Sequence, residues 1–227
     1  MTPHPQTPRS RSVRWRLRPW LRRSGALLLL LGVVSAGCST AEGEGEVHSD
    51  RLFIEGCWNG SYDLKPSFFA ANPYRDTMLI RIQRGEDIEE LSDGLVVMVN
   101  NVDGIRQGLL GTSIPVGLPS GVQPVGTPIR QLEEPLVSLS LYLHQTCHEQ
   151  NGTLHAVEGT ITFSDLFSGD PNETNGDDRL TDAEFDATFV DPRDATADGS
   201  YPAGRTSRVT GKFRFFFQRG QPAQPFP

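Results

Sequence analysis

Apolar and polar residues alternate with a period of two along much of the chain. Between Val137 and Leu143, apolar residues occupy every second position, with Ser138, Ser140 and Tyr142 between them. This alternation is typical of a β-strand with one buried face. We expect a first strand within residues 51–62, interrupted around Asn59-Gly60. Further alternating runs occupy residues 78–83, 95–99, 157–163, 185–189 and 209–217.

Long amphipathic helical stretches do not occur in the sequence, and only residues 86–91 suit a helix of one or two turns. The 17 prolines and 23 glycines would break helices but suit the corners of a sheet protein. We therefore predict one all-β domain over residues 51–218, a single antiparallel β-sandwich of about seven or eight strands. For the long apolar connection 104–131 we expect irregular edge strands packed on the sandwich, or an exposed surface for a partner.

A short apolar segment near the start of the chain predicts export. Residues 26–36 are uncharged and mostly apolar, and seven arginines but no acidic residue precede them. Eleven residues are too few to span a bilayer, which needs about 20. A basic region followed by a short apolar region and small residues is typical of a secretory signal.

The end of this segment resembles the lipobox of bacterial lipoproteins. The matching residues are Ala36, Gly37 and Cys38, whereas Ser35 stands where the motif usually has Leu or Val. The resemblance implies that residues 1–37 are a lipoprotein signal peptide and that Cys38 becomes the lipidated N-terminus in the bacterial cell envelope. In such lipoproteins an aspartate after the cysteine favours the inner membrane, so Ser39 favours the outer membrane. An ordinary cleaved signal with an incidental cysteine is the alternative.

The charge of the remaining chain excludes nucleic acid as a partner. Because seven arginines precede Cys38, the rest of the chain carries a net charge of −14, against −7 for the whole chain. Nucleic acid and anionic lipid surfaces would repel it. The acidic, glycine-rich residues 38–50 are predicted to be a flexible tether, and residues 219–227 a Pro-rich tail.

Two cysteines remain once Cys38 is acylated. An even pair in an oxidising compartment favours a disulfide between Cys57 and Cys147, with two buried free thiols as the alternative.

Residues 164–198 hold eleven acidic residues against Arg179 and Arg193. Within them, residues 173–184 resemble an EF-hand calcium loop, which implies a site for Ca²⁺ built from oxygen ligands. Two positions depart from the motif: the first ligand is Glu, and Asp178 replaces the usual glycine. A solvated acidic loop is the alternative. The implied ligands are Glu173, Asn175, Asp177, the carbonyl of Arg179, Thr181 and Glu184.

One further resemblance bears on the fold. Gly56-Cys57-Trp58 resembles the Gly-x-Trp of lipocalins, which implies a closed lipocalin-like β-barrel that binds a small apolar ligand. The region from Asn100 to Asp103 does not continue into the expected second motif. A core tryptophan beside a disulfide is the plainer interpretation.

The sequence contains no Gly-x-Ser-x-Gly motif of hydrolases, no P-loop and no His-Glu-x-x-His motif of metalloproteases. We therefore predict a non-enzymatic lipoprotein, held on a membrane by its anchor, that acts as a binding or structural module for an envelope protein or polymer. The lipocalin-like binder is the second hypothesis, and a hydrolase of unrecognised type is the third.

Overall fold

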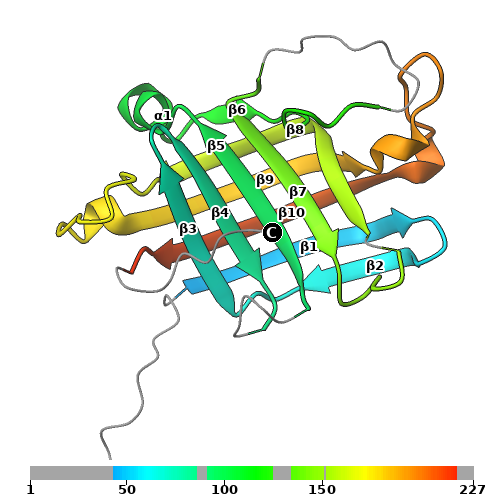
Figure 1. Ribbon diagram of the computed structural model, residues 1–227, viewed down its shortest axis with the longest axis horizontal. Coiled ribbons are helices and arrows are strands. Elements are labelled where there is room, and N and C mark those ends of the chain that lie inside the picture. The colour runs from blue at the N-terminus through cyan, green and yellow to red at the C-terminus, as the bar shows by residue number, and fades with distance from the viewer. Residues whose placement is uncertain (1–42, 86–90, 125–133, 151, 219–227) are drawn as a thin grey trace, which may run out of the picture. The chain divides into compact units, whose positions relative to one another are not determined.

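A computed structural model describes residues 43–85, 91–124, 134–150 and 152–218 (Figure 1). The predicted signal peptide, Cys38, the tail 219–227 and most of the predicted helical segment 86–91 lie outside the described residues. The described part confirms the all-β prediction, because ten strands form one antiparallel sheet. They are β1 (Gly43–Ile54), β2 (Trp58–Leu64), β3 (Phe68–Tyr74), β4 (Thr77–Gln83), β5 (Asp93–Asn100), β6 (Ser113–Pro115), β7 (Val137–Leu143), β8 (Thr153–Asp165), β9 (Leu180–Val190) and β10 (Thr206–Phe216).

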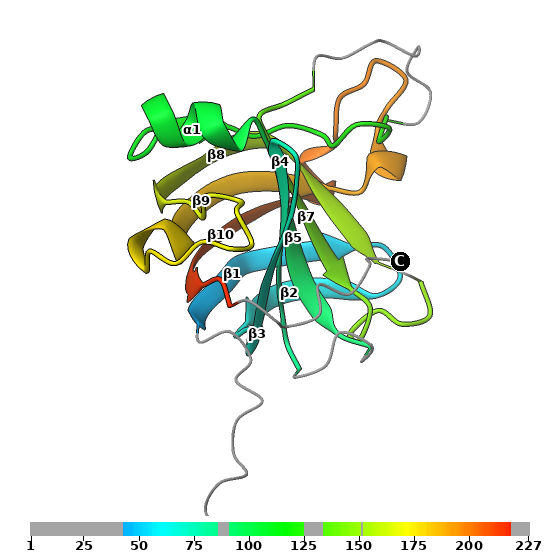
Figure 2. The same ribbon diagram turned by 60° about the vertical axis from the view of Figure 1, so that its left-hand side comes forward.

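Nine strands follow one another in the order β2-β1-β10-β9-β8-β7-β5-β4-β3, and β6 pairs with β8 beside this path. The sheet curls into a half-barrel, so that β3, β4, β5 and β7 cross in front of the other strands (Figures 1 and 2). The change of direction occurs at β8. Its first residues, Thr153 to His155, pair with β7, and β8 pairs with β9 from His155 onward.

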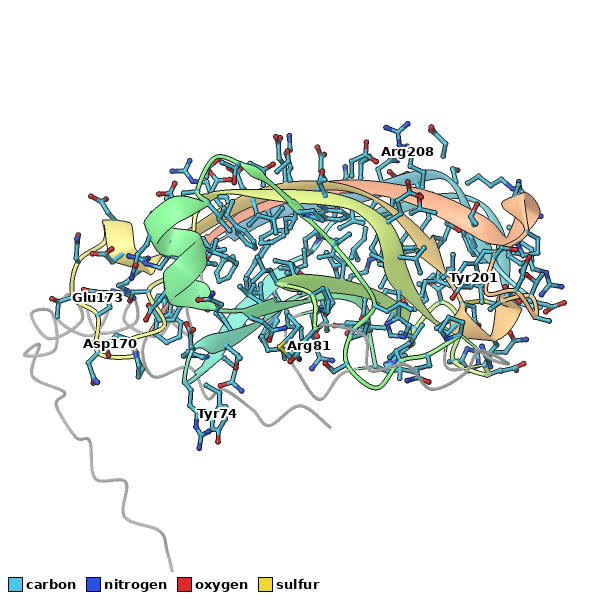
Figure 3. The ribbon with its side chains drawn as sticks, turned by 90° about the horizontal axis from the view of Figure 1, so that it is seen from above. Tyr74, Arg81, Asp170, Glu173, Tyr201 and Arg208 are labelled. Atoms are coloured by element: carbon cyan, nitrogen blue, oxygen red, sulfur yellow. A yellow bond between two sulfur atoms is a disulfide. The ribbon has the colours of Figure 1, made fainter. Side chains whose placement is uncertain are left out.

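The interior between the two halves of the curled sheet is filled with side chains (Figure 3). The ring of Phe69 on β3 stacks on Phe215 of β10, with 5.8 Å between their centroids, so residues from opposite halves meet. The largest side chains with less than 2 % exposure include Phe163, Phe167, Phe189, Phe213, Phe215, Leu52, Leu64 and Met78.

Most alternating runs supply their apolar positions to this interior, as expected from the sequence. The run 157–163 is an exception, because an irregularity in the pairing between Ala156 and Glu158 shifts the alternation and leaves Val157 outside the buried set. β7 was predicted to have one buried face, but its other face is buried as well, at Ser138 and Tyr142.

The first strand begins earlier than predicted, which corrects the domain boundary at residue 51 and shortens the tether. Residues 43–48 pair with β10, beginning with Gly43 opposite Phe215. The start of this strand shows no alternation of apolar residues in the sequence, because two glycines occupy positions that face inward. A Cβ on Gly43 would approach Phe69 and Phe215 within 2.7 Å, and one on Gly45 would lie 3.2 Å from Pro66. The turn between β1 and β2 lies at Gly56, whose φ is +75°, and Asn59-Gly60 belongs to β2.

The strand count is also higher than predicted, because β3 and β6 were not recognised and because the single strand expected within residues 51–62 is divided between β1 and β2. β3 contains Asn72 and Pro73, which disfavour a strand in general but are tolerated at a sheet edge, where β3 lies.

The long connection was predicted to form irregular edge strands packed on the sandwich. It begins with a helix, α1 (Val102–Gly108), which was not predicted, and then supplies one short strand of the predicted kind, β6, which pairs with β8. Ile105, Ile114 and Val116 from this connection are buried, and Leu110 is 38 % exposed. Residues 125–133 lie outside the described residues.

Candidate functional site

The outer side of β1, β10, β9 and β8 forms a polar face. Because side chains alternate along a strand, most apolar positions of these strands fill the interior and most polar ones point outward. A shallow hollow of about 390 Å³ lies on this face. We define the polar face by the residues that line the hollow with polar side chains: Glu46, His48, Ser113, Thr160, Thr162, Glu184, Asp186, Thr210 and Lys212.

Ion pairs between neighbouring strands order the polar face. Lys212 Nζ lies 3.1 Å from Glu46 Oε1 on β1, and β9 places Glu184 opposite Lys212 on its other side. Arg208 donates to both carboxyl oxygens of Asp186, and this pairing lowers the pKa of Asp186. Exposed pairs of this kind contribute about 0–1 kcal/mol each to stability. Their main effect is to fix the orientation of charged groups that remain accessible to a partner.

His48 is the residue of the polar face whose side-chain type ordinarily titrates nearest neutral pH. Its ring nitrogens lie 2.7 Å from Asp63 Oδ1 and 3.1 Å from Asp50 Oδ1. The hydrogen bond to Asp63, followed by the one to Asp50, raises the pKa of His48 above its ordinary value. The positive charge of the polar face therefore depends on pH.

The predicted calcium ligands begin in the loop between β8 and β9, which we call the acidic loop (residues 166–179). Glu173 Oε1 accepts hydrogen bonds from the backbone N–H groups of Thr174 and Asn175, each at 2.9 Å. Asn175 Oδ1 accepts from the Asp177 N–H, and its amide nitrogen donates to Asp178. These side chains are therefore already bonded within the loop.

Asp178, at the position that a calcium loop fills with glycine, pairs with α1. Arg106 Nη2 lies 2.5 Å from Asp178 Oδ1, and Arg106 also donates to the carbonyl of Leu166. The hydrogen bonds from Arg106 and then from Asn175 lower the pKa of Asp178. Residues 177–179 form a 3-10 helix rather than the sharp turn of an EF-hand.

The last three predicted ligands lie apart from the first three. The carbonyl of Arg179 accepts a hydrogen bond from the Phe217 N–H at 2.8 Å. Thr181 is fully buried and accepts from the Phe167 N–H, whereas Glu184 is exposed on the opposite side of β9 and lines the polar face. The structure thus brings Glu173, Asn175 and Asp177 into one loop but directs Thr181 and Glu184 to different faces. The described residues contain no group of three or more His, Cys, Asp or Glu arranged to hold a metal ion.

The predicted disulfide is present. It joins Cys57 to Cys147 across 90 positions of sequence, with 5.8 Å between their Cα atoms. Trp58, next to Cys57, packs against the core and contacts the ring of Tyr62 edge-on.

A buried carboxyl group, which the sequence did not predict, lies beside the disulfide. Asp93 is 0 % exposed, and its Oδ1 accepts from the N–H groups of Gln145 and Thr146, just before Cys147. Its Oδ2 accepts from the hydroxyls of Tyr62 and Thr146. Burial, followed by the charge of Asp93, raises the pKa of Tyr62. The sequence did contain one indication that Asp93 is buried. It lies two positions before Leu95, and so falls on the same face of β5 as the buried positions 95, 97 and 99.

Comparisons with other proteins do not assign the chain to a family. A scan against protein-family models found no match, and searches of curated proteins and of solved structures found none. Within the described part of the chain, α1 and the other helices are too short or too polar to cross a membrane.

Proposed function

We propose that this chain is a non-enzymatic lipoprotein of the bacterial outer membrane that binds a hydrophilic polymer of the cell envelope through its polar face. The lipobox-like residues Ala36, Gly37 and Cys38 support the anchor. Lipidation explains how a body with a net charge of −14 and a polar exterior stays on a membrane, because several acyl chains on one residue hold it stably.

The observation that carries the binding role is the contrast between the two sides of the same strands. On β9, Ala183, Phe185 and Ala187 are buried in the interior, whereas Glu184 and Asp186 lie on the polar face. A sheet backed by a filled core is rigid, and its ordered charges and threonine hydroxyls need little rearrangement to bind a partner. Peptidoglycan is a suitable polymer, because it offers hydroxyl, amino and carboxyl groups to such a surface.

Within the all-β class, the architecture that suits this role is a sandwich, in which the two halves of the curled sheet pack face to face. The stacking of Phe69 on Phe215 and the hydrogen bond from Tyr62 to Asp93 both join the two halves through the interior. A lipocalin-like binder of apolar ligands would need that space for its cargo. The buried phenylalanines therefore favour the polar face over the interior as the binding surface.

The anchor has a direct test. Wild-type protein is expected in the membrane fraction with an acylated Cys38 by mass spectrometry, and Cys38→Ala is expected in the soluble periplasmic fraction. Sedimentation of Cys38→Ala with membranes to the same extent as the wild type would refute anchoring through this residue.

The binding surface is tested by sedimentation with purified peptidoglycan. The double variant Glu184→Lys, Asp186→Lys reverses two charges on the polar face and is expected to lose most binding. The matched control is Asp103→Lys, Glu149→Lys, which makes the same change in net charge on α1 and on the turn after Cys147, away from the polar face. Equal binding by both double variants would exclude the polar face, and no sedimentation of the wild type would exclude this polymer.

A further inference from the structure

Covalent geometry limits how far the domain can lie from its anchor. Four residues separate Cys38 from Gly43, where β1 begins. A fully extended chain spans at most about 3.6 Å per residue, so the Cα atoms of these two residues are no more than about 18 Å apart. β1 itself has 12 residues, and at a rise of about 3.3 Å each its far end lies more than 30 Å away. An acylated Cys38 therefore keeps the Gly43 end of β1 close to the bilayer, whereas the covalent link places no such limit on the far end.

This end of the sheet carries an exposed aromatic side chain. Gly43 pairs with Phe215, so the neighbouring Phe216, near the end of β10, lies beside the start of β1. Phe216 is 41 % exposed, although the adjacent inward-facing Phe215 is 1 % exposed. Within the described residues, the other large apolar side chains with comparable exposure are Tyr74, Leu91 and Leu110.

The surroundings of Phe216 are built to hold it in place. Its neighbour Phe217 stacks on the buried Phe167 with 4.1 Å between ring centroids. The Phe217 carbonyl accepts a hydrogen bond from Arg179 Nε at 2.7 Å, and its N–H donates to the Arg179 carbonyl. The backbone that presents Phe216 is therefore fixed on both sides, and the exposed ring is not part of a loose strand end.

Charge does not draw this end to a membrane. The acidic loop, with Asp170 and Glu173 labelled in Figure 3, lies at the same end of the sheet as the start of β1 (Figure 1). Anionic headgroups would repel these carboxyl groups. The attraction must come from the acyl chains and from apolar contact, and aromatic side chains are favoured at the boundary between headgroups and hydrocarbon.

We propose that the end of the sheet at Gly43 and Phe216 faces the membrane and that the Phe216 ring inserts at the lipid headgroup boundary. This inference rests on the proposed lipidation of Cys38. It assigns an orientation to the domain: the acidic loop lies near the lipid surface, and the disulfide end with Trp58 projects away from it.

The chain contains its own control for a fluorescence test. Trp15 and Trp20 precede Cys38 and are lost with the signal peptide, so Trp58 is the only tryptophan of the processed chain. It pairs with Ile54 at the far end of β1. The lipidated protein is reconstituted into vesicles of phosphatidylcholine brominated on its acyl chains, which quench tryptophan only at close range. We expect the wild-type fluorescence to be unchanged by bromination.

The variant Phe216→Trp adds a second fluorophore at the proposed contact, where partial exposure leaves room for the larger ring. Its additional fluorescence is expected to be lost in brominated vesicles. Phe53→Trp, the matched control near the far end of the neighbouring strand β1, is expected to remain unquenched.

The outcomes separate the orientation from the anchor. If Phe216→Trp floats with the vesicles but is quenched no more than Phe53→Trp, the orientation is overturned while anchoring stands. If Cys38 carries no acyl group and the protein does not float, the proposed anchor fails and the orientation fails with it.

Discussion

Replacing Asp93 with alanine tests whether the buried carboxyl group holds the disulfide end of the fold. The substitution leaves the Tyr62 hydroxyl and the N–H groups of Gln145 and Thr146 without their acceptor. A buried polar group without a partner costs about 1–3 kcal/mol. Tyr62 is 4 % exposed and should lose the full amount, whereas the exposed Gln145 can turn to water. We expect a total loss of about 2–4 kcal/mol in the free energy of unfolding.

The assay is urea and thermal unfolding of the oxidised protein. At about 2–4 °C per kcal/mol for a domain of this size, Asp93→Ala should lower the melting temperature by roughly 10 °C. Asp93→Asn keeps one acceptor oxygen and should cost about half as much, because the rotatable hydroxyls of Tyr62 and Thr146 can accept from the new amide.

Asp186→Ala is the matched control, since it removes an exposed carboxyl group paired with Arg208 and should change stability by no more than about 0.5 kcal/mol. A loss for Asp93→Ala as small as that of the control would refute the role assigned to the buried carboxyl group.

Three further predictions concern the disulfide, the polar face and the acidic loop. Reduction should lower the urea midpoint, because the disulfide closes a loop of 90 residues and the lost closure entropy is worth up to about 4–5 kcal/mol; an unchanged midpoint would contradict this. By NMR, the pKa of His48 should lie above its ordinary value of 6.5, and Asp63→Asn should lower it. Because the pKa is raised in the folded state, the bond to Asp63 stabilises the fold below pH 6.5. This contribution disappears as the pH rises through the folded pKa. An unchanged pKa in that variant would exclude Asp63 as the main cause. If the acidic loop binds calcium, a concentration of 100 times Kd should stabilise by about 2.7 kcal/mol and raise the melting temperature by roughly 5–10 °C, reversibly with chelator. Glu173→Gln should abolish that rise and Glu184→Ala on the polar face should not; equal responses would rule out a site confined to the loop.

The acidic loop illustrates what a linear motif leaves undetermined. Residue spacing predicted that Thr181 and Glu184 share a site with Glu173. Leu180 instead begins β9, and in a strand residues three positions apart point to opposite faces. A calcium loop requires a different backbone, in which the same spacing converges on one ion. The spacing alone could not distinguish the two.

The sequence by itself determined the all-β class and the inward faces of most of the long strands, and it favoured the pairing of Cys57 with Cys147. These follow from local alternation and from cysteine number, which the chain shows without any long-range contact. Only the tertiary structure decided that Gly43 begins a strand, that Pro73 lies at an edge and that Asp93 finds its donors in a turn some 50 residues later. Each of these depends on which distant segment packs against the residue. A glycine under a phenylalanine ring and a buried carboxyl group with four donors are favourable only because of neighbours that the fold supplies.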